Sequence, residues 1–387
     1  MTKVKSENIQ YVQTFQFCRN KQNNFICGDE ILIKRGKDRT LIIVIDGVGS
    51  GMRANICASL FGSELMSFLD KDYSLIEACR LVVESIKIGK RSDNFAAFSA
   101  ATVLHTGHVQ IVSYEAPEPV YIDNNFAYVP KGYVRKAGSE NLIETNFMLG
   151  ENKAFFLFSD GVSQSGMGRG FGYGIGSAGV ADILNDFLKT ANKYEDAAKK
   201  VLDYCYSISG SKWEDDTSAV LITPRKAITA NILTGPPSSK SLDEKFVKDF
   251  EKAIGFKIIS GSTTLDIYCR HTGGNAKMLS SFNPFEAPVY KIDNIDFASE
   301  GAIMLNQLYN LYELNPSNLD TNASITKLKE LLDISDKICF FLGKAENQEQ
   351  NNSMMFSQLR IFPRKRIIKL LSEKFKEQCK VVSVKEY

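Results

Sequence analysis

The chain has 387 residues, which is long for one hydrophobic core and predicts two domains. Its 47 basic and 45 acidic residues leave a formal net charge of +2, which argues against a general nucleic-acid binder or a membrane-surface protein. No apolar run approaches the roughly 20 residues that a membrane helix needs, and residues 1–7 are too polar for a signal peptide. We therefore expect a cytoplasmic protein with neither a nucleic-acid nor a membrane partner.

Cysteine and histidine are poorly placed for a metal site. The eight cysteines include no Cys-x-x-Cys pair, and the chain has only three histidines. This pattern predicts neither a zinc site nor a disulfide framework. Any bound metal should therefore be held by oxygen ligands.

The N-terminal part of the chain is organised around a strand that ends in a carboxylate. Residues 41–45 form a continuous apolar run rich in β-branched side chains, which is typical of a strand buried on both faces. Asp46 stands where this strand ends, and a glycine-rich stretch at 47–51 follows it. Two amphipathic helices and two shorter strands accompany this strand, the helices at 53–69 and 74–88 and the strands at 11–17 and 31–34.

Two later stretches repeat this pattern. Residues 155–158 form another apolar strand that ends near Asp160, and a glycine-rich segment that we interpret as a mobile flap follows at 161–176. Asp215 and Asp216 open a third strand. The third strand is expected at 219–222, and two helices are expected at 178–189 and 194–206. Four further strands, expected to form an antiparallel meander, lie at 100–104, 109–113, 120–122 and 126–129. Strands and helices without strict alternation predict an α+β fold.

Near residue 226 strands and helices begin to alternate. The expected strands are 228–233, 256–260, 337–342 and 380–384, and the expected helices are 242–254, 298–313, 323–333 and 364–378. Residues 261–264 are interpreted as a turn with helix-capping side chains. This alternation is typical of an open α/β sheet. We therefore predict a first domain over 1–226 and a second, α/β domain over 228–387.

The strand-end carboxylates also have a purely structural explanation. Asp-Gly is a common hairpin-turn dipeptide, so a turn of the chain is the alternative explanation for Asp46 and Asp160. A hairpin needs a second strand directly afterwards, whereas a helix follows the first dipeptide and a long glycine-rich segment follows the second. The pair Asp215 and Asp216, taken alone, is typical of a solvated turn. As a set, three strand-end carboxylates far apart in the sequence are expected to converge on a metal cluster.

Carboxylates and a backbone carbonyl, without cysteine or histidine, suit hard ions such as Mg²⁺ or Mn²⁺. Two such ions about 4 Å apart activate a shared water and stabilise the oxygens of a phosphoryl group. This chemistry needs no protein nucleophile, which agrees with the lack of a Cys-x5-Arg motif in the chain.

Four motifs, in this order, resemble those of the metal-dependent protein serine/threonine phosphatases, the superfamily that includes protein phosphatase 2C. The motifs lie at 28–29, 46–51, 158–162 and 215–220. Within the superfamily they are most similar to the bacterial branch of the stage II sporulation protein E type, and the resemblance covers about residues 10–223. It implies an αββα sandwich, with two antiparallel sheets flanked by helices and metals at one end.

The resemblance also implies a role for each matching position. Asp46 would bridge two Mn²⁺ or Mg²⁺ ions, and the carbonyl of Gly47 would hold the first ion. Asp160 and Asp215 would ligate the second ion, and Asp29 would act on the first directly or through water. These four aspartates are the expected catalytic residues, because they would hold the metal-activated water.

The chain departs from the family pattern at residues 114–119. Relatives often have Asn-Ala-Gly-His-Pro-Pro there, whereas this chain has Tyr-Glu-Ala-Pro-Glu-Pro, which adds Glu115 and Glu118. Asp216 is a candidate for a third, weakly bound ion. The substrate-binding residue is not identified by the resemblance, and Arg19 and Arg53 are only candidates for an arginine that grips phosphate.

The C-terminal region carries weaker functional signals. Residues 234–237 and 261–264 could place backbone amides and hydroxyls around an anion at strand ends, although ordinary loops use the same residue types. The basic stretch 363–366 fits a solvated helix face better than a nucleic-acid contact. We interpret this region as a domain that senses a small ligand or a protein partner and regulates the first domain.

The leading functional hypothesis is a Mn²⁺- or Mg²⁺-dependent phosphatase acting on phosphoserine or phosphothreonine of a protein in bacterial signalling. One alternative is a phosphatase-like scaffold with little catalysis, in which the C-terminal domain binds a partner or ligand. Three converging carboxylates count against a scaffold, because they repel one another without metal. A phosphatase of a small phosphorylated metabolite remains the third hypothesis, because a metal-activated water does not distinguish what lies beyond the phosphate.

Overall fold

The computed structural model describes residues 11–36, 38–88, 96–190, 193–279, 287–314, 324–345 and 361–387. Residues 1–7, whose polarity entered the expected location, lie outside these ranges. The chain divides into two compact units between residues 226 and 227, and each unit is described by itself. None of the helices in the described ranges has the length and apolar content needed to span a membrane.

Two antiparallel sheets form the centre of the N-terminal unit. The five-stranded sheet contains, in spatial order, β1 (Tyr11–Arg19), β11 (Thr217–Arg225), β10 (Lys153–Phe158), β6 (Val120–Asp123) and β7 (Phe126–Tyr128). The six-stranded sheet contains β2 (Asp29–Arg35), β3 (Arg39–Gly47), β4 (Ala96–Leu104), β5 (His108–Tyr114), β9 (Glu140–Met148) and β8 (Tyr133–Ala137).

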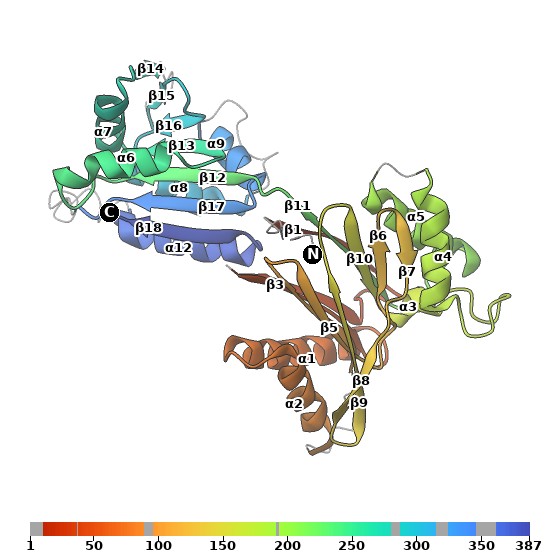
Figure 1. Ribbon diagram of the computed structural model, residues 1–387. Coiled ribbons are helices and arrows are strands. Elements are labelled where there is room, and N and C mark those ends of the chain that lie inside the picture. Colours follow the sequence, from red (N-terminus) through yellow and green to blue (C-terminus); the bar gives the residue numbers. More distant parts are fainter. Residues whose placement is uncertain are drawn as a thin grey trace, which may run out of the picture. The chain divides into compact units, whose positions relative to one another are not determined.

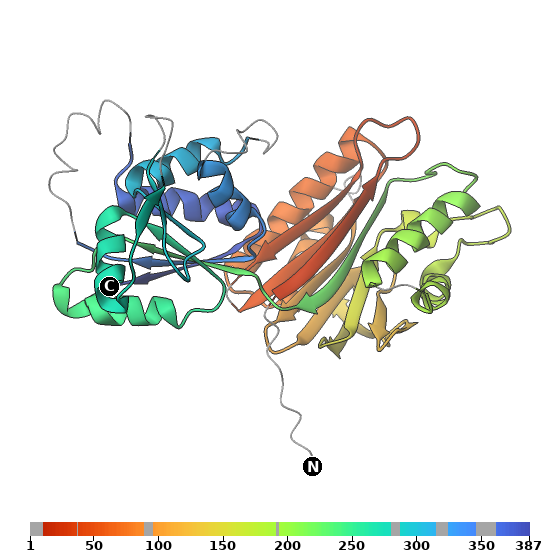
Figure 2. The ribbon, with the colours of Figure 1, turned by 90° about the horizontal axis from the view of Figure 1, so that it is seen from above.

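Helices cover the outer face of each sheet. The helices are α1 (Met52–Asp70) and α2 (Leu75–Ile88) on the six-stranded sheet, and α4 (Gly176–Leu188) and α5 (Tyr194–Ile208) on the five-stranded sheet. The sequence of β3 is apolar at successive positions because both of its faces are buried. Ile43 and Ile45 pack against α1 and α2, whereas Ile42 and Val44 pack between the sheets. Figures 1 and 2 show the resulting layers, with α1 and α4 on opposite sides. The predicted αββα sandwich is confirmed.

Three details of the N-terminal unit differ from the sequence-based expectation. The predicted single meander over 100–129 is wrong, because the chain leaves one sheet after β5 and enters the other at β6. Pro117 and Pro119 lie in this connection and have no N–H for a β ladder, and Glu115 has φ of 48°. The hairpin of β8 and β9 was not predicted from the sequence. Asp160 does not lead directly into a loop but begins a short helix, α3 (Asp160–Ser163).

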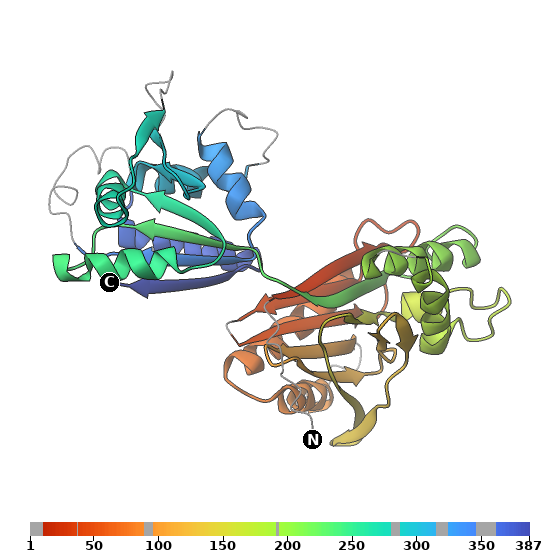
Figure 3. The ribbon, with the colours of Figure 1, turned by 45° about the horizontal axis from the view of Figure 1, so that its top comes forward.

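The C-terminal unit is built on one mixed sheet, in which the strands that follow the α/β pattern are parallel. Its spatial order is β14 (Lys277–Leu279), β15 (Val289–Lys291), β16 (Phe297–Ser299), β13 (Phe256–Ser260), β12 (Thr229–Thr234), β17 (Lys337–Leu342) and β18 (Val381–Glu386). Figure 3 shows β12 and β13 (green) beside β17 and β18 (blue). The α/β fold predicted for the C-terminal region is therefore confirmed.

Helices cover both faces of this sheet (Figure 1). The short helix η1 (Lys240–Leu242) leads into α6 (Asp243–Glu251), which with α7 (Ser262–Thr272) packs on one face. The other face carries α8 (Ala302–Leu311), α9 (Ser324–Asp333) and α12 (Arg364–Glu377). The expected side-chain cap at 261–264 is wrong: Gly261 is the N-cap of α7, and no side chain caps it. The helix expected at 298–313 begins only at Ala302, because residues 297–299 form β16.

Candidate metal centre

Asp29 and Asp46 lie directly opposite each other in the antiparallel pair of β2 and β3. Residues in this relation place their side chains on the same face of the sheet, close together. The start of β2 is held against α1, because Asn55 Nδ2 donates a hydrogen bond of 3.0 Å to the carbonyl of Cys27. Two carboxylates from neighbouring strands are therefore fixed beside each other by the backbone.

Two glycines next to the predicted ligands allow close packing. A Cβ atom on Gly47 would lie 2.0 Å from the carbonyl oxygen of Ala54 in α1. A Cβ atom on Gly161 would lie 2.3 Å from the carbonyl oxygen of Asp216. Glycine is therefore required at both places for α1 and the start of β11 to reach the carboxylates.

Hydrogen bonds join the end of β10 to the start of β11. The backbone N–H of Ser159 donates to the carbonyl of Ser218 at 2.9 Å, and the N–H of Ser218 donates to Ser159 Oγ at 2.9 Å. This pairing brings Asp160, which follows Ser159, toward the Asp215 loop. Gln164 Nε2 donates to Asp160 Oδ2 at 2.8 Å, which orients the carboxylate from within the next helical turn.

Asp46 and Asp160 line the same small pocket. Asp46 belongs to β3 of the six-stranded sheet, whereas Asp160 follows β10 of the five-stranded sheet. Glu115, one of the two extra acids of the loop at 114–119, also lines this pocket. Its φ of 48° is in the left-handed region, which is uncommon for a residue other than glycine and often marks a functional position. The other extra acid, Glu118, accepts a hydrogen bond of 2.8 Å from Ser177 at its backbone carbonyl.

The two adjacent acids at the start of β11 have different surroundings. Asp215 is partly exposed, and its Oδ1 lies 3.5 Å from Lys21 Nζ. Asp216 is only 3% exposed, and its Oδ1 accepts the backbone N–H of Lys21 at 2.8 Å. A Cβ atom on Gly28 would lie 2.8 Å from Asp216 Oδ2, so Asp216 is next to the start of β2. The sequence-based prediction assigned Asp216 only a minor role, because nothing in a pair of adjacent acids shows which one is buried.

Burial and mutual repulsion raise the pKa of three of these carboxyl groups. Burial raises the pKa of Asp46 to about 9, and the charges of Asp29 and Asp160 act in the same direction. Burial raises the pKa of Asp29 to about 6, against the effect of the hydroxyls of Ser159 and Ser218. Burial also raises the pKa of Asp215, and the Lys21 ammonium opposes it. The protein alone therefore provides too little positive charge for this group of acids.

Several carboxylate oxygens at this end of the sandwich lack a partner. Both oxygens of Asp29, which is 4% exposed, and Oδ2 of Asp216 are buried without a hydrogen bond of normal geometry in the described part of the chain, although the hydroxyls of Ser159 and Ser218 are near enough to Asp29 to act on its pKa. Buried polar atoms are rarely left in this state. Within the same residues, however, no three Asp, Glu, His or Cys side chains are close enough together to hold a metal ion as they stand. The acids are neighbours but not an assembled metal site.

The two arginines considered for substrate phosphate lie at the ends of separate elements. Arg19 is exposed at the end of β1 and donates from Nη1 to the adjacent Cys18 carbonyl at 2.8 Å. Arg53 is exposed in the first turn of α1, after the N-cap Gly51. These positions do not assign phosphate binding to either arginine.

Comparison with known proteins relates the N-terminal unit to one family. Residues 36–225 match the family model described as Stage II sporulation protein E (SpoIIE). The phosphoserine phosphatase RsbX of Bacillus subtilis (strain 168) is 28% identical over 83 residues, which are 21% of this chain and 42% of that protein. The match therefore spans less than half the length of this curated relative.

Two solved structures are similar at low sequence identity. The RsbU and RsbW domains of Rv1364c from Mycobacterium tuberculosis give a TM-score of 0.48 at 16% identity, with 64% of this chain and 69% of that chain covered. RsbX in complex with magnesium gives a TM-score of 0.41 at 15% identity, with 55% of this chain and 96% of that chain covered. Together, the match to the family model, the motifs and the αββα sandwich lead to one conclusion: residues 36–225, just under half of the chain, are similar to the stage II sporulation protein E (SpoIIE) family.

Proposed function

We propose that the N-terminal unit is a phosphatase that uses two Mn²⁺ or Mg²⁺ ions to remove phosphate from phosphoserine or phosphothreonine of a protein. The match of residues 36–225 to the SpoIIE family model and the similarity to a phosphoserine phosphatase support this activity. The observation that carries the proposal is the pair of opposed carboxylates, Asp29 and Asp46, in a group of acids whose buried oxygens lack partners.

The donor atoms fit divalent ions that prefer oxygen. Asp29, Asp46, Asp160 and Asp215 offer carboxylate oxygens, and Gly47 offers a backbone carbonyl at the end of β3. The unpartnered oxygens of Asp29 and Asp216 would gain a partner from a bound cation. A bound cation would also offset the mutual repulsion that raises the pKa of Asp46 and Asp29.

Each residue has a proposed role. Asp46 would help to hold both ions, the Gly47 carbonyl and Asp29 would hold the first, and Asp160 and Asp215 would hold the second. Asp216 is proposed for a third, weakly held ion, and its position beside Gly28 places it near the first-ion residues.

When bound, the ions would lower the pKa of a water and stabilise negative charge on the phosphate oxygens. The chain itself positions the carboxylates through backbone pairing and a side-chain hydrogen bond. The β2–β3 ladder fixes Asp29 opposite Asp46, and Gln164 orients Asp160. Because the ions would lower the pKa of the attacking water, no protein side chain would have to act as its base.

We further propose that the enzyme works in a bacterial signalling circuit and that the C-terminal unit regulates it. The support is indirect: the second unit has its own sheet and its own two hydrophobic cores, so it can carry a separate binding function. The phosphoprotein substrate and the regulatory ligand or partner belong to this proposal as chemical classes only.

The test is hydrolysis of an aryl phosphate and of a phosphothreonine peptide by the full chain, with Mn²⁺ and after removal of metal. Three proteins are compared, the wild type, Asp160→Asn and Asp182→Asn. Asp182 is an exposed residue of α4, so its variant makes the same chemical change away from the site. We expect Mn²⁺-dependent turnover that falls at least about a hundredfold in Asp160→Asn and is unchanged in Asp182→Asn.

The outcome also separates the alternatives. Turnover of the peptide well above that of small phosphate esters supports a protein phosphatase, and the reverse preference supports a metabolite phosphatase. Metal binding without turnover of either substrate would favour a scaffold with little catalysis.

A further inference from the structure

Three buried hydroxyl side chains lie in register across the sheet of the C-terminal unit. Thr234, Ser260 and Ser299 end the parallel strands β12, β13 and β16 and are paired with one another in the β ladders. Their exposed fractions are 0%, 2% and 1%. Ile232, two residues before Thr234, packs in the core beneath α8, α9 and α12, and so do the residues two before the serines. Because side chains alternate along a strand, all three hydroxyls are on this face.

The hydroxyls differ in their hydrogen bonds. Ser260 Oγ donates to the carbonyl of Gly301 at 3.3 Å, and Ser299 Oγ donates to the carbonyl of Glu300 at 3.2 Å. Thr234 Oγ1 is buried and has no hydrogen-bond partner within the described residues. A buried hydroxyl in that state is unfavourable unless a further molecule completes its bonding.

Arg364 brings a positive charge to the same end of β12. Its guanidinium packs on Gly235, which follows Thr234: a Cβ atom on Gly235 would lie 2.4 Å from Arg364 Nη1. Gly235 has φ of 80°, so both its conformation and the available space favour glycine. Arg364 Nε is buried without a partner among the described residues, and burial lowers the pKa of this guanidinium. The residue as a whole is only partly buried, which leaves a route to solvent.

Two helices of this face begin near this position, and no side chain caps either of them. Gly301 is the N-cap of α8, and Pro363 is the N-cap of α12. Asn306 of α8 holds the start of α12, because its Nδ2 donates to the Phe362 carbonyl at 3.0 Å and its Oδ1 accepts the Phe362 N–H at 2.8 Å. The free N–H groups at helix N-termini carry partial positive charge and favour anions.

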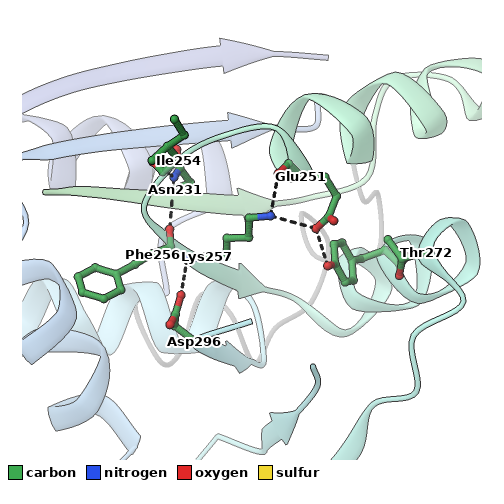
Figure 4. Close-up of polar contacts among 8 residues, drawn as sticks. Asn231, Glu251, Ile254, Phe256, Lys257, Thr272 and Asp296 are labelled. Carbon is green, nitrogen blue, oxygen red and sulfur yellow. Dashed lines mark hydrogen bonds and ion pairs between the residues drawn. The ribbon is translucent and has the colours of Figure 1, made fainter. Parts of the chain in front are cut away.

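Polar side chains nearer the beginnings of β12 and β13 are paired, as Figure 4 shows for Asn231 and Lys257. Asn231 Nδ2 donates to the Phe256 carbonyl at 3.3 Å. Lys257 pairs through Nζ with Glu251 at 3.3 Å, and its backbone N–H donates to Asp296 Oδ2 at 2.7 Å. In contrast, Thr234 Oγ1 and Arg364 Nε, which lack partners among the described residues, lie at the carboxyl end of β12.

The topology marks the same position. The parallel strands are ordered β16-β13-β12-β17-β18, so the chain adds strands on one side of β12 and then crosses to the other side at β17. In open α/β sheets, ligands bind outside the carboxyl ends of the strands where the order reverses in this way. Thr234 and Gly235 stand at the end of β12, at this reversal.

We infer that this end of the C-terminal unit binds the phosphate group of a small molecule. Arg364 supplies the positive charge, the Thr234 hydroxyl donates a hydrogen bond, and the N-termini of α8 and α12 supply further positive potential. A phosphate has enough acceptor oxygens for a guanidinium, a hydroxyl and backbone donors together. The site is independent of the proposed phosphatase activity, because every residue in it belongs to the second unit.

The experiment is calorimetric titration of inorganic phosphate into the full chain after metal has been removed, so that phosphate cannot bind as a product on metal ions. The variants are Arg364→Gln, Thr234→Val and Lys369→Gln. Lys369 is an exposed cation of the same helix, so its variant is the matched control for the loss of charge. We expect phosphate binding that weakens at least about tenfold in Arg364→Gln and about threefold in Thr234→Val, and that is unchanged in Lys369→Gln.

Two further arms identify the source of the phosphate. Adenosine monophosphate and adenosine are titrated under the same conditions. Tighter binding of the monophosphate than of inorganic phosphate assigns the site to a phosphorylated metabolite, and equal binding assigns it to free phosphate. In both cases the Arg364→Gln variant must lose the binding and adenosine must not bind.

The inference is overturned if the wild type binds neither phosphate nor the monophosphate, or if Arg364→Gln and Lys369→Gln bind equally well. Loss of binding in Asp160→Asn would also overturn it, because that result places the phosphate in the metal centre. Melting temperatures without ligand check the variants. Arg364→Gln is expected to be at least as stable as the wild type, because it removes an unpaired buried charge. If it does not fold, the nearly isosteric Thr234→Val carries the test.

Discussion

Asp29 and Asp46 are paired directly across the β2–β3 ladder, so the backbone holds two carboxylates side by side. Like charges in directly opposed positions destabilise an antiparallel pair. The cost is increased here by burial, which raises both pKa values. A divalent cation removes this repulsion, and the predictions below follow from that balance.

The stability of the metal-free protein should depend on pH. The ordinary pKa of 3.8 is raised to about 6 for Asp29 and about 9 for Asp46 in the folded chain. The folded state therefore keeps protons that the unfolded chain releases, so this stabilisation is complete below the unfolded pKa and is lost as pH rises through 6 and then 9. We expect the metal-free chain to melt at a lower temperature at about pH 8 than at about pH 5.

Asp46→Asn tests the origin of this pH dependence. The variant has no proton to lose at this position, so the difference between the two pH values should shrink and the metal-free protein should gain stability at alkaline pH. Asp182→Asn, on the exposed face of α4, should keep the wild-type difference. An unchanged pH dependence in Asp46→Asn would show that other groups cause it.

Lys21 should compete with the metal for Asp215. Its Nζ lies 3.5 Å from Asp215 Oδ1, and a bound ion would take over this oxygen. In Lys21→Gln we expect the affinity for Mn²⁺ to rise by about threefold, since partly exposed ion pairs are weak. The fluorescence of Trp213, which lies near Asp215 and contacts Tyr206, provides the readout.

The matched control for Lys21 is Lys212→Gln. Lys212 pairs with Glu214 at 3.2 Å in the same loop but not with Asp215. Its variant should bind Mn²⁺ as the wild type does. Weaker binding in Lys21→Gln would mean that Lys21 supports the site instead of competing with metal.

Gly47→Ala should destabilise the protein because the new methyl group would meet the Ala54 carbonyl at 2.0 Å. Such overpacking typically costs about 1–3 kcal/mol. Gly172→Ala is the control, because no atom lies within 4 Å of its added Cβ and its φ is not positive. Chemical denaturation of both variants measures the difference, and equal stabilities would contradict the close packing of α1 on β3.

The fragment 1–226 should fold without the C-terminal unit. All three hydrophobic clusters of the N-terminal unit are made of its own residues, and both of its sheets are complete within it. Circular dichroism and cooperative thermal unfolding check this. Once the fragment is shown to fold, a change in its specific activity relative to the full chain would support regulation, and identical activities would contradict it.

The sequence predicted the fold where its signals are local. Apolar runs such as 41–45 and 155–158 are strands, because β-branched and aromatic residues suit a sheet buried on both faces. The sheet in which each strand lies is set by long-range pairing, so the change of sheet between β5 and β6 was missed. The β8–β9 hairpin was missed because β8 is mostly exposed and β9 buries polar residues such as Glu144 and Thr145, so neither strand has a clear apolar pattern.

For the candidate site, the sequence predicted the residues better than their surroundings. Asp29, Asp46, Asp160 and Asp215 were singled out by motif and by their place near strand ends. Burial is a property of the folded chain, so the sequence could not show that Asp216 is enclosed while Asp215 is paired with Lys21. The same holds for Glu115, whose approach to the pocket of Asp46 and Asp160 depends on an unusual backbone angle.

The most direct test of the account is calorimetric titration of Mn²⁺ into the metal-free full chain and its Asp46→Asn and Asp182→Asn variants. We predict two bound ions per chain in the wild type and in Asp182→Asn, and loss of tight binding of both ions in Asp46→Asn, because that carboxylate is proposed to bridge them. Failure of the wild type to bind Mn²⁺, or wild-type binding by Asp46→Asn, would contradict the proposed metal centre.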